Sequence, residues 1–152
     1  MQQNNQNIIR MRKRLFLLLL AFISLCQMNA VERTKLNFNG GWLLKVGDFP
    51  GAEQANYKDA GWKQITLPRA FNEKEAFKVS IEHLSDTIMW YRKHFHIQEV
   101  GDRKYFIEFE GVRYGADIWL NGKKVGYTEN GVMASGFDLT PYIIKGENVI
   151  AV

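Results

Sequence analysis

The dipeptide Asn121-Gly122 is the feature that most constrains how this chain can fold. Just before it, the apolar residues Ala116, Ile118 and Leu120 recur at every second position. An Asn-Gly pair beside such a strand pattern is the strongest short-range signal for a two-residue hairpin turn, because both turn positions need a positive φ. The sequence therefore predicts an antiparallel hairpin at this point.

Other short strands are predicted wherever apolar residues alternate between turn residues, at 42–46, 63–67, 90–97, 104–110 and 147–152. A parallel α/β sheet would need amphipathic segments of ten or more residues between its strands, and the sequence after position 30 has none. Short strands at roughly ten-residue spacing are typical of a sandwich or jelly roll. We therefore predict an all-β sandwich.

The strand at 90–97 has two different faces. Its first face carries Tyr91, Phe95 and Ile97 and is predicted to face the core, with Lys93 as the one exception. The opposite face carries Trp90, Arg92, His94 and His96. In the next strand, 104–110, the inward residues are Tyr105, Ile107 and Phe109. We predict that these two strands pair with each other through a turn near Gly101-Asp102.

The first thirty residues have the pattern of a secretory signal peptide. Four basic residues lie between positions 10 and 14, and an apolar run from 15 to 25 follows, which is short for a membrane span. Ala30 is a small residue at a suitable cleavage point. This predicts a signal at 1–30, a sandwich domain at 31–152 and export to the periplasm or the extracellular space. An alternative is a lipid anchor on Cys26, against which the bulky Leu25 argues.

Removal of the signal changes the charge of the chain. Of the 20 Lys and Arg, 4 lie in residues 1–30, whereas none of the 16 Asp and Glu do, so 20 − 4 = 16 basic residues face 16 acidic ones. A net charge of zero leaves no support for binding to nucleic acid. A polar, uncharged ligand fits better. The mature chain also has no cysteine and must be stabilised by its core.

Several motifs occur together in a recognisable order: Leu-Pro at 67–68 with Asn72, Trp-Tyr-Arg-Lys-His-Phe at 90–95, the block 109–126, Glu-Asn-Gly at 129–131, Phe-Asp-Leu-Thr at 137–140, and 146–152. In this arrangement the chain resembles the amino-terminal, galactose-binding-like jelly-roll domain of the family 2 glycoside hydrolases, which include β-galactosidases and β-glucuronidases. The Glu-Asn-Gly sequence resembles the form of this loop in the β-galactosidase-like branch of the family. Arg69 stands where the family commonly has His, which weakens any assignment to one sugar.

The resemblance implies a fragment of an exported, retaining β-glycosidase. In the family, this domain precedes an immunoglobulin-like sandwich and a (β/α)8 barrel that carries both catalytic glutamates. No position of this chain inherits a catalytic residue, and the strand pattern that runs to Val152 without a turn has the look of a truncated domain. The alternatives are a free-standing carbohydrate-binding module and a purely structural sandwich. No pattern specifies an oligomeric state.

Four residues are predicted to contact a β-linked saccharide: Asp86, Trp119, Glu129 and Asn130. Trp119 alternates with the inward residues on either side and should point outward, where a ring can stack on a sugar. It could instead cover a second layer or a neighbouring domain. The resemblance implies that Asp86 reaches the substrate pocket, although a role in a turn also fits its place in a loop. The resemblance also places Glu129 and Asn130 in the loop after the hairpin.

Two other pairs of residues carry side chains that could do chemistry. Glu108 and Glu110 lie on one face of a strand but are interpreted as a solvent-exposed or domain-facing stripe, because a catalytic acid needs a raised pKa. His94 and His96 also share a face, yet no third ligand at a recognisable spacing accompanies them, so no metal site is predicted. The sequence has no phosphate-binding loop or esterase elbow, and we expect no cofactor.

Overall fold

The computed structural model describes residues 10–16, 33–69 and 87–152. Residues 10–16 form a short helix in a first unit, which extends to Leu36, and Asn37–Val152 form a second compact unit. In the described segments, no helix has the length and apolar character needed to cross a membrane. Most of the predicted signal peptide lies outside the described residues.

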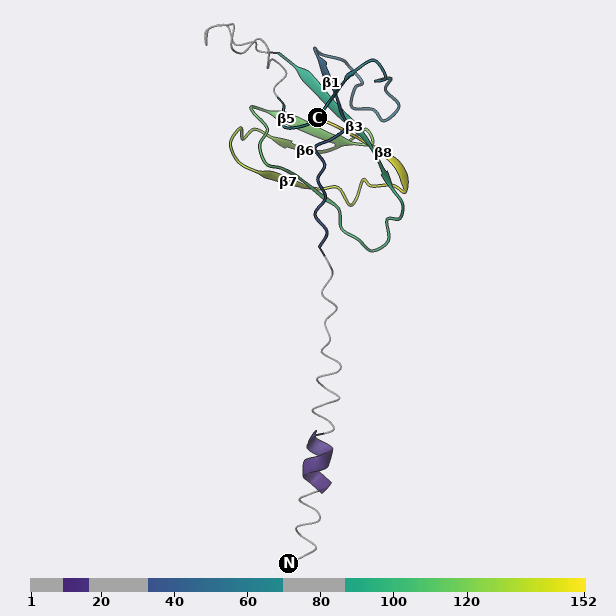
Figure 1. The fold of residues 1–152 in the computed structure, drawn as a ribbon, viewed down its shortest axis with the longest axis vertical. Helices are drawn as coiled ribbons and strands as arrows, with labels where there is room; N and C mark the ends of the chain where they lie inside the picture. Colours follow the sequence, from purple (N-terminus) through teal and green to yellow (C-terminus); the bar gives the residue numbers. More distant parts are fainter. Residues whose placement is uncertain (1–9, 17–32, 70–86) are drawn as a thin grey trace, which may run out of the picture. The chain divides into compact units, whose positions relative to one another are not determined.

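The second unit is built from strands that form two antiparallel sheets (Figure 1). The larger sheet has the order β2-β1-β3-β8-β5-β6, and the smaller one pairs β4 with β7. The strands are β1 (Trp42–Val46), β2 (Lys63–Ile65), β3 (Met89–Ile97), β4 (Phe106–Phe109), β5 (Ala116–Leu120), β6 (Lys123–Thr128), β7 (Ser135–Asp138) and β8 (Gly146–Ala151). The predicted all-β class is confirmed.

The predicted hairpin is also confirmed. Asn121 and Gly122 have φ values of 53° and 79°, and they connect β5 to β6 with Leu120 opposite Lys123. The Asn121 side chain adds three further bonds. Its amide donates to the carbonyl of Tyr142 at 3.0 Å and to the side-chain oxygen of Asn148 at 2.8 Å, and its oxygen accepts from the backbone nitrogen of Val149 at 2.9 Å. The turn is thereby fixed to β8 as well as to its own strands.

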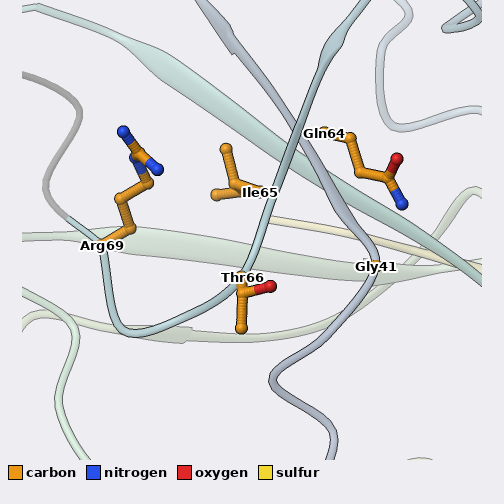
Figure 2. A pocket seen from close by; sticks show the side chains of 5 residues that line it. All are labelled: Gly41, Gln64, Ile65, Thr66 and Arg69. Carbon is orange, nitrogen blue, oxygen red and sulfur yellow. The ribbon is translucent and has the colours of Figure 1, made fainter.

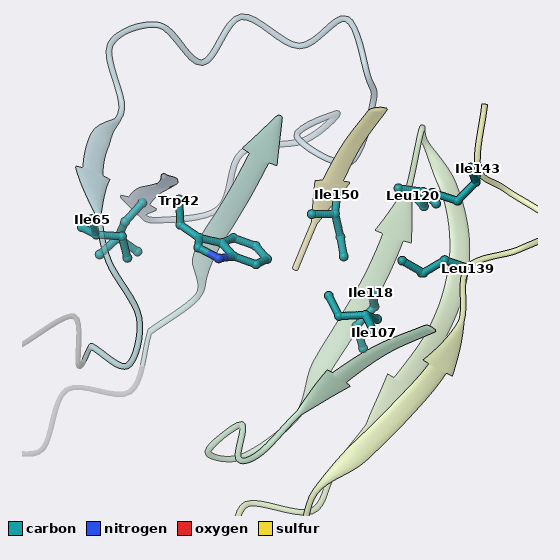
Figure 3. Packing of buried hydrophobic residues seen from close by; sticks show 9 residues of the cluster. Trp42, Ile65, Ile107, Ile118, Leu120, Leu139, Ile143 and Ile150 are labelled. Carbon is teal, nitrogen blue, oxygen red and sulfur yellow. The ribbon is translucent and has the colours of Figure 1, made fainter. Parts of the chain in front are cut away.

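The main core lies between the two sheets. In Figure 3, Ile107 of β4 and Leu139, just after β7, lie opposite Ile118 of β5. Ile118, Leu120 and Ile150 are completely buried there. Trp42 and Ile65 extend the same core toward β1 and β2. Burial of each such side chain contributes about 1.5 to 3 kcal/mol, so this layer is the principal source of stability.

A second apolar cluster covers part of the other face of the larger sheet. Residues 47–62, which we call the cover, follow β1 and supply Ala52 and Trp62 to this cluster. From the sheet come Trp90 of β3 and Ala151 of β8, both buried. The larger sheet is therefore packed on both faces along β3, which explains why Trp90 is buried although it lies opposite the core.

The predicted pairing between strand 90–97 and strand 104–110 is wrong. β3 pairs with β1 along one edge and with β8 along the other, and β4 belongs to the other sheet. The turn at Gly101-Asp102 exists, but it carries the chain from the larger sheet to the smaller one, where β4 pairs with β7. Sequence neighbours here are separated because a sandwich needs the chain to cross between its sheets.

Lys93, the exception in the predicted inward face, has a physical explanation. Its ammonium donates to the backbone carbonyls of Phe38, at 2.9 Å, and of Gly40, and lies 4.0 Å from the centre of the Phe38 ring. Burial lowers the pKa of Lys93. The side chain thus ends at the border of the core, where it binds the segment that leads into β1.

Candidate functional site

Trp119 lies on the outer face of β5, as predicted, with Ile118 and Leu120 buried on the inner face. It is half-buried and stacks on Trp90, with 5.3 Å between the ring centroids and 30° between the ring planes. It packs against the second apolar cluster. This packing matches the alternative in which Trp119 covers a second layer, and the half-exposed ring still leaves some apolar surface at the edge of that layer.

Glu129 and Asn130 begin the loop between β6 and β7, and both are exposed. The Asn130 carboxamide oxygen accepts a 3.3 Å bond from the backbone nitrogen of Val132, which shapes the loop locally. A Cβ atom on Gly131 would lie 3.3 Å from the backbone nitrogen of Tyr114, so this loop lies directly against the loop that precedes β5.

Among the described residues, the predicted sugar contacts are divided between the two ends of the β5–β6 hairpin. Trp119 lies at the turn end of the β5–β6 hairpin, opposite Lys124, whereas Glu129 follows the open end, after Thr128. Four residues, 125–128, separate Lys124 from Glu129, and a bulge beside Trp119 takes one residue out of the strand register, so the two positions are roughly 13 Å apart along the hairpin. Asp86 lies outside the described residues. Trp119 and the Glu129-Asn130 loop therefore lie at opposite ends of the hairpin.

The loops at the open end of the hairpin carry large exposed apolar side chains. Tyr114 is 72%, Val132 90% and Met133 62% exposed, and Tyr127 lies beside Gly115 in the same region. We call these four residues the end-loop patch. Contiguous exposed apolar residues mark surfaces that are covered by a partner or ligand. Glu129 and Asn130 adjoin this patch in sequence, which makes it the stronger of the two candidate contact surfaces.

A shallow polar hollow lies at the edge of the larger sheet, beside the start of β1 and the end of β2 (Figure 2). Its volume is about 380 Å³, and it is lined by Gly41, Gln64, Ile65, Thr66 and Arg69. Its described lining contains no carboxylate. The described residues supply amide, hydroxyl and guanidinium groups that can bond a polar molecule, but not the pair of acids that glycoside hydrolysis requires.

A network of charged side chains joins the cover to the sheet, and the sequence analysis missed it. Asp59 of the cover accepts from Arg92 Nε at 2.7 Å and bonds to His94 Nε2 at 2.8 Å, both through its Oδ2 atom. His94 Nδ1 lies 2.8 Å from Glu147 Oε1 on β8. Arg92 is completely buried, and its Nη1 donates to the backbone carbonyls of Ala52 and, at 3.0 Å, of Gln54.

These contacts shift the proton affinities of two groups. Burial by itself raises the pKa of Asp59, but the bonds from Arg92 and His94 outweigh it and lower that pKa overall. Burial favours the neutral imidazole of His94, yet its bonds to Asp59 and Glu147 raise its pKa above the ordinary value. A lowered pKa is the opposite of what a general acid needs, so Asp59 is a structural carboxylate.

The Glu108-Glu110 and His94-His96 pairs lie apart from any arrangement of catalytic acids or metal ligands among the described residues. Glu108 and Glu110 are exposed on and beside β4. His94 uses both ring nitrogens for carboxylates, while His96 lies further along β3 and is exposed. Across the described parts of the chain, no group of three or more His, Cys, Asp or Glu is arranged to hold a metal ion.

Three comparisons with known proteins agree with one another. Residues 48–152 match the family model described as "Glycosyl hydrolases family 2, sugar binding domain". A β-glucuronidase of Formosa agariphila is 40% identical over 130 residues, which cover 80% of this chain and 13% of that protein. A β-galactosidase of Thermoanaerobacter pseudethanolicus is 36% identical over 123 residues, which cover 79% of this chain and 16% of that protein.

The fold has solved counterparts as well. The structure of a β-glucuronidase from glycoside hydrolase family 2 superposes with a TM-score of 0.68 at 34% identity, and the match covers 82% of this chain and 14% of that one. The chain thus spans about one seventh of the length of these relatives.

Proposed function

Since this chain belongs to the sugar-binding domain family of the family 2 glycosyl hydrolases, we propose that it is the amino-terminal jelly-roll domain of a retaining β-glycosidase. The match over residues 48–152 carries this proposal. In the intact enzyme the domain would serve as a scaffold beside the catalytic body and contribute to carbohydrate binding. The domain itself has the galactose-binding-like form of a jelly roll.

Catalysis is assigned to parts of the enzyme outside this chain. Retention requires two carboxyl groups about 5 to 5.5 Å apart, one of which acts as an acid and needs a raised pKa. Asp59, the buried carboxylate of the described residues, has a lowered pKa because it is bonded to two cationic side chains. The immunoglobulin-like domain and the (β/α)8 barrel of the intact enzyme are the proposed partners.

The proposed substrates are β-linked saccharides, with β-galactosides first. This choice rests on the Glu-Asn-Gly sequence at 129–131 and on relatives that are named β-galactosidases. Relatives named β-glucuronidases favour a second candidate, a β-glucuronide, whose carboxylate would need a cationic partner in the enzyme.

The end-loop patch is the proposed contact surface for the rest of the enzyme. Exposed apolar side chains of this size are costly on a free surface, and they cluster on two adjoining loops. Glu129 and Asn130, at the start of one of these loops, would then lie at the border between the domain and the substrate cleft. Trp119 is the alternative sugar contact, on the outer face of the larger sheet.

The test uses the 152-residue chain. We expect no turnover of p-nitrophenyl β-galactoside or β-glucuronide, and titration with galactose-terminated and glucuronate-terminated oligosaccharides should shift NMR signals of Glu129 and Asn130. Asn130→Ala should reduce these shifts, whereas Glu99→Gln, at another exposed loop position, should leave them unchanged. Hydrolysis that purifies with the chain and survives Asn130→Ala would contradict the assignment of catalysis.

A free-standing carbohydrate-binding module is the second candidate function. The observation in its favour is that Asn37–Val152 form a compact unit with a core of their own. The two candidates differ in affinity: a module that works alone should bind a glycan at millimolar concentration or better, whereas a scaffold domain should bind weakly until the barrel is present. Isothermal titration of the chain separates the two.

We further propose that residues 1–30 export the protein to the periplasm or the extracellular space. The basic residues at 10–14 and the apolar run at 15–25 support this proposal. The alternative is that the protein is exported and then held at a membrane by a lipid attached to Cys26.

A further inference from the structure

The cover is attached to the sheet by side chains of β3. Arg92 and His94 lie on the same face of this strand and both bond to Oδ2 of Asp59 in the cover, at 2.7 and 2.8 Å. Arg92 also bonds to the carbonyls of Ala52 and Gln54. Arg92 is always charged, so its contribution does not vary with pH. The contribution of His94 depends on whether its ring carries one proton or two.

With both neighbouring carboxylates ionised, the contacts of His94 are both satisfied only by the doubly protonated ring. Nε2 lies 2.8 Å from Asp59 and Nδ1 lies 2.8 Å from Glu147, so each ring nitrogen faces a carboxylate oxygen, which can only accept. A neutral imidazole has one N–H and can satisfy one of these two partners. The charged groups that face the ring are Asp59 from the cover and Glu147 from β8, with Arg92 on its own strand bonded to the same Asp59 oxygen.

We propose that His94 is a proton-dependent latch that holds the cover closed over β3. When the ring is protonated, it connects the cover to both β3 and β8. When the ring loses a proton, one of its two carboxylate contacts becomes a contact between lone pairs and is lost. The cover is then held mainly by Arg92 and by its apolar contacts, and it opens more often.

The direction of the pH dependence follows from linkage. A group whose pKa is raised in the closed state stabilises that state fully below its ordinary pKa, which is about 6.5 for His. This stabilisation is lost as the pH rises through the raised value. If the pKa of His94 is about one unit higher with the cover closed than with the cover open, loss of the proton lowers the ratio of closed to open cover about tenfold.

Backbone hydrogen exchange of the whole chain measures this opening. The amides of Ala52, Gln54 and Tyr57 are bonded within the cover and report on it. Between about pH 5.5 and about pH 9, we expect their protection, corrected for the intrinsic rate at each pH, to fall as His94 loses its proton. The pKa of His94 itself is read from its ring signals by NMR and should lie above that of a free imidazole.

Matched variants test the latch against a general pH effect. His96→Gln changes an exposed histidine two residues along the same face and should retain the fall in protection. His94→Gln should abolish it. Glu147 is 69% exposed, so Glu147→Gln should leave the fold intact and bring the His94 pKa closer to its ordinary value. The proposal is overturned if His94→Gln keeps the pH-dependent protection, or if Glu147→Gln leaves the His94 pKa unchanged.

Discussion

Replacement of Arg92 by methionine would remove a fully buried positive charge that the larger sheet directs into the cover. The Arg92 side chain has no exposed surface, and its Nε lies 2.7 Å from Asp59 Oδ2. Methionine keeps much of the apolar stem and can fill the space. The substitution therefore separates the charge of Arg92 from its packing.

The expected cost can be worked out from the partners that Arg92 leaves behind. Asp59, with 10% of its side chain exposed, would keep His94 as its cationic partner, and the carbonyls of Ala52 and Gln54 would lose a donor. Removal of one member of a buried ion pair typically costs about 3 to 5 kcal/mol. Arg92 Nη2 has no partner in the described part of the chain, so the native arrangement is not ideal. We expect a loss near the lower end, about 3 kcal/mol.

Urea denaturation followed by tryptophan fluorescence measures this loss, since Trp62 and Trp90 lie in the same layer. Lys124→Met is the matched control: it breaks an ion pair with Asp117 at the surface, where both side chains are more than a third exposed, and should cost about 0 to 1 kcal/mol.

A second substitution tests the cause of the loss. Asp59→Asn in the Arg92→Met background neutralises the carboxylate that has lost its guanidinium partner and should recover about 1 kcal/mol or more. If Arg92→Met costs no more than Lys124→Met, or if Asp59→Asn restores nothing, the buried network does not hold the cover and the argument fails.

Two further predictions follow: one concerns the packing of the two sheets against each other, and the other concerns export by the amino-terminal segment. A Cβ atom on Gly126 of β6 would overlap with the ring edge of Phe137 in β7, so Gly126→Ala should lower the free energy of unfolding by about 1 to 3 kcal/mol. Gly111→Ala is the control, because a Cβ atom there has nothing within 4 Å and should change the stability little. Equal midpoints of the two variants in thermal unfolding would contradict this prediction. Fusion of residues 1–30 to alkaline phosphatase, which is active only after export, should give periplasmic activity that is lost when Arg10 to Arg14 are made neutral, and activity that stays in the cytoplasm would refute export.

Local patterns in the sequence were enough to predict much of the sandwich. The Asn121-Gly122 turn depends on backbone sterics at two adjacent positions, and the inward faces of β3 and β4 depend on a period of two. Both are properties of a few consecutive residues. The inner set of Tyr91, Phe95 and Ile97 does pack on the main core, as the alternation predicts.

The pairing of strands and the charged network could not be predicted in the same way. Asp59 and Arg92 are 33 residues apart, and no spacing in the sequence indicates that they meet. The prediction that β3 pairs with β4 assumes that consecutive strands are neighbours. In the structure, β3 pairs instead with β1 and β8, which come from distant parts of the chain. Competition for strand edges is a property of the complete sheet.

The two-sided packing of β3 limits where the domain can meet a ligand or another domain. Polar residues on a strand usually indicate a solvent-exposed face, but here Arg92 lies under the cover, between the buried Trp90 and the half-exposed His94. The cover therefore occupies the outer face of the sheet along β1 and β3. Under the function proposed above, contact with a sugar or with another domain would then involve the outer side of β5, beside Trp119, or the end-loop patch, whose large apolar side chains are exposed among the described residues.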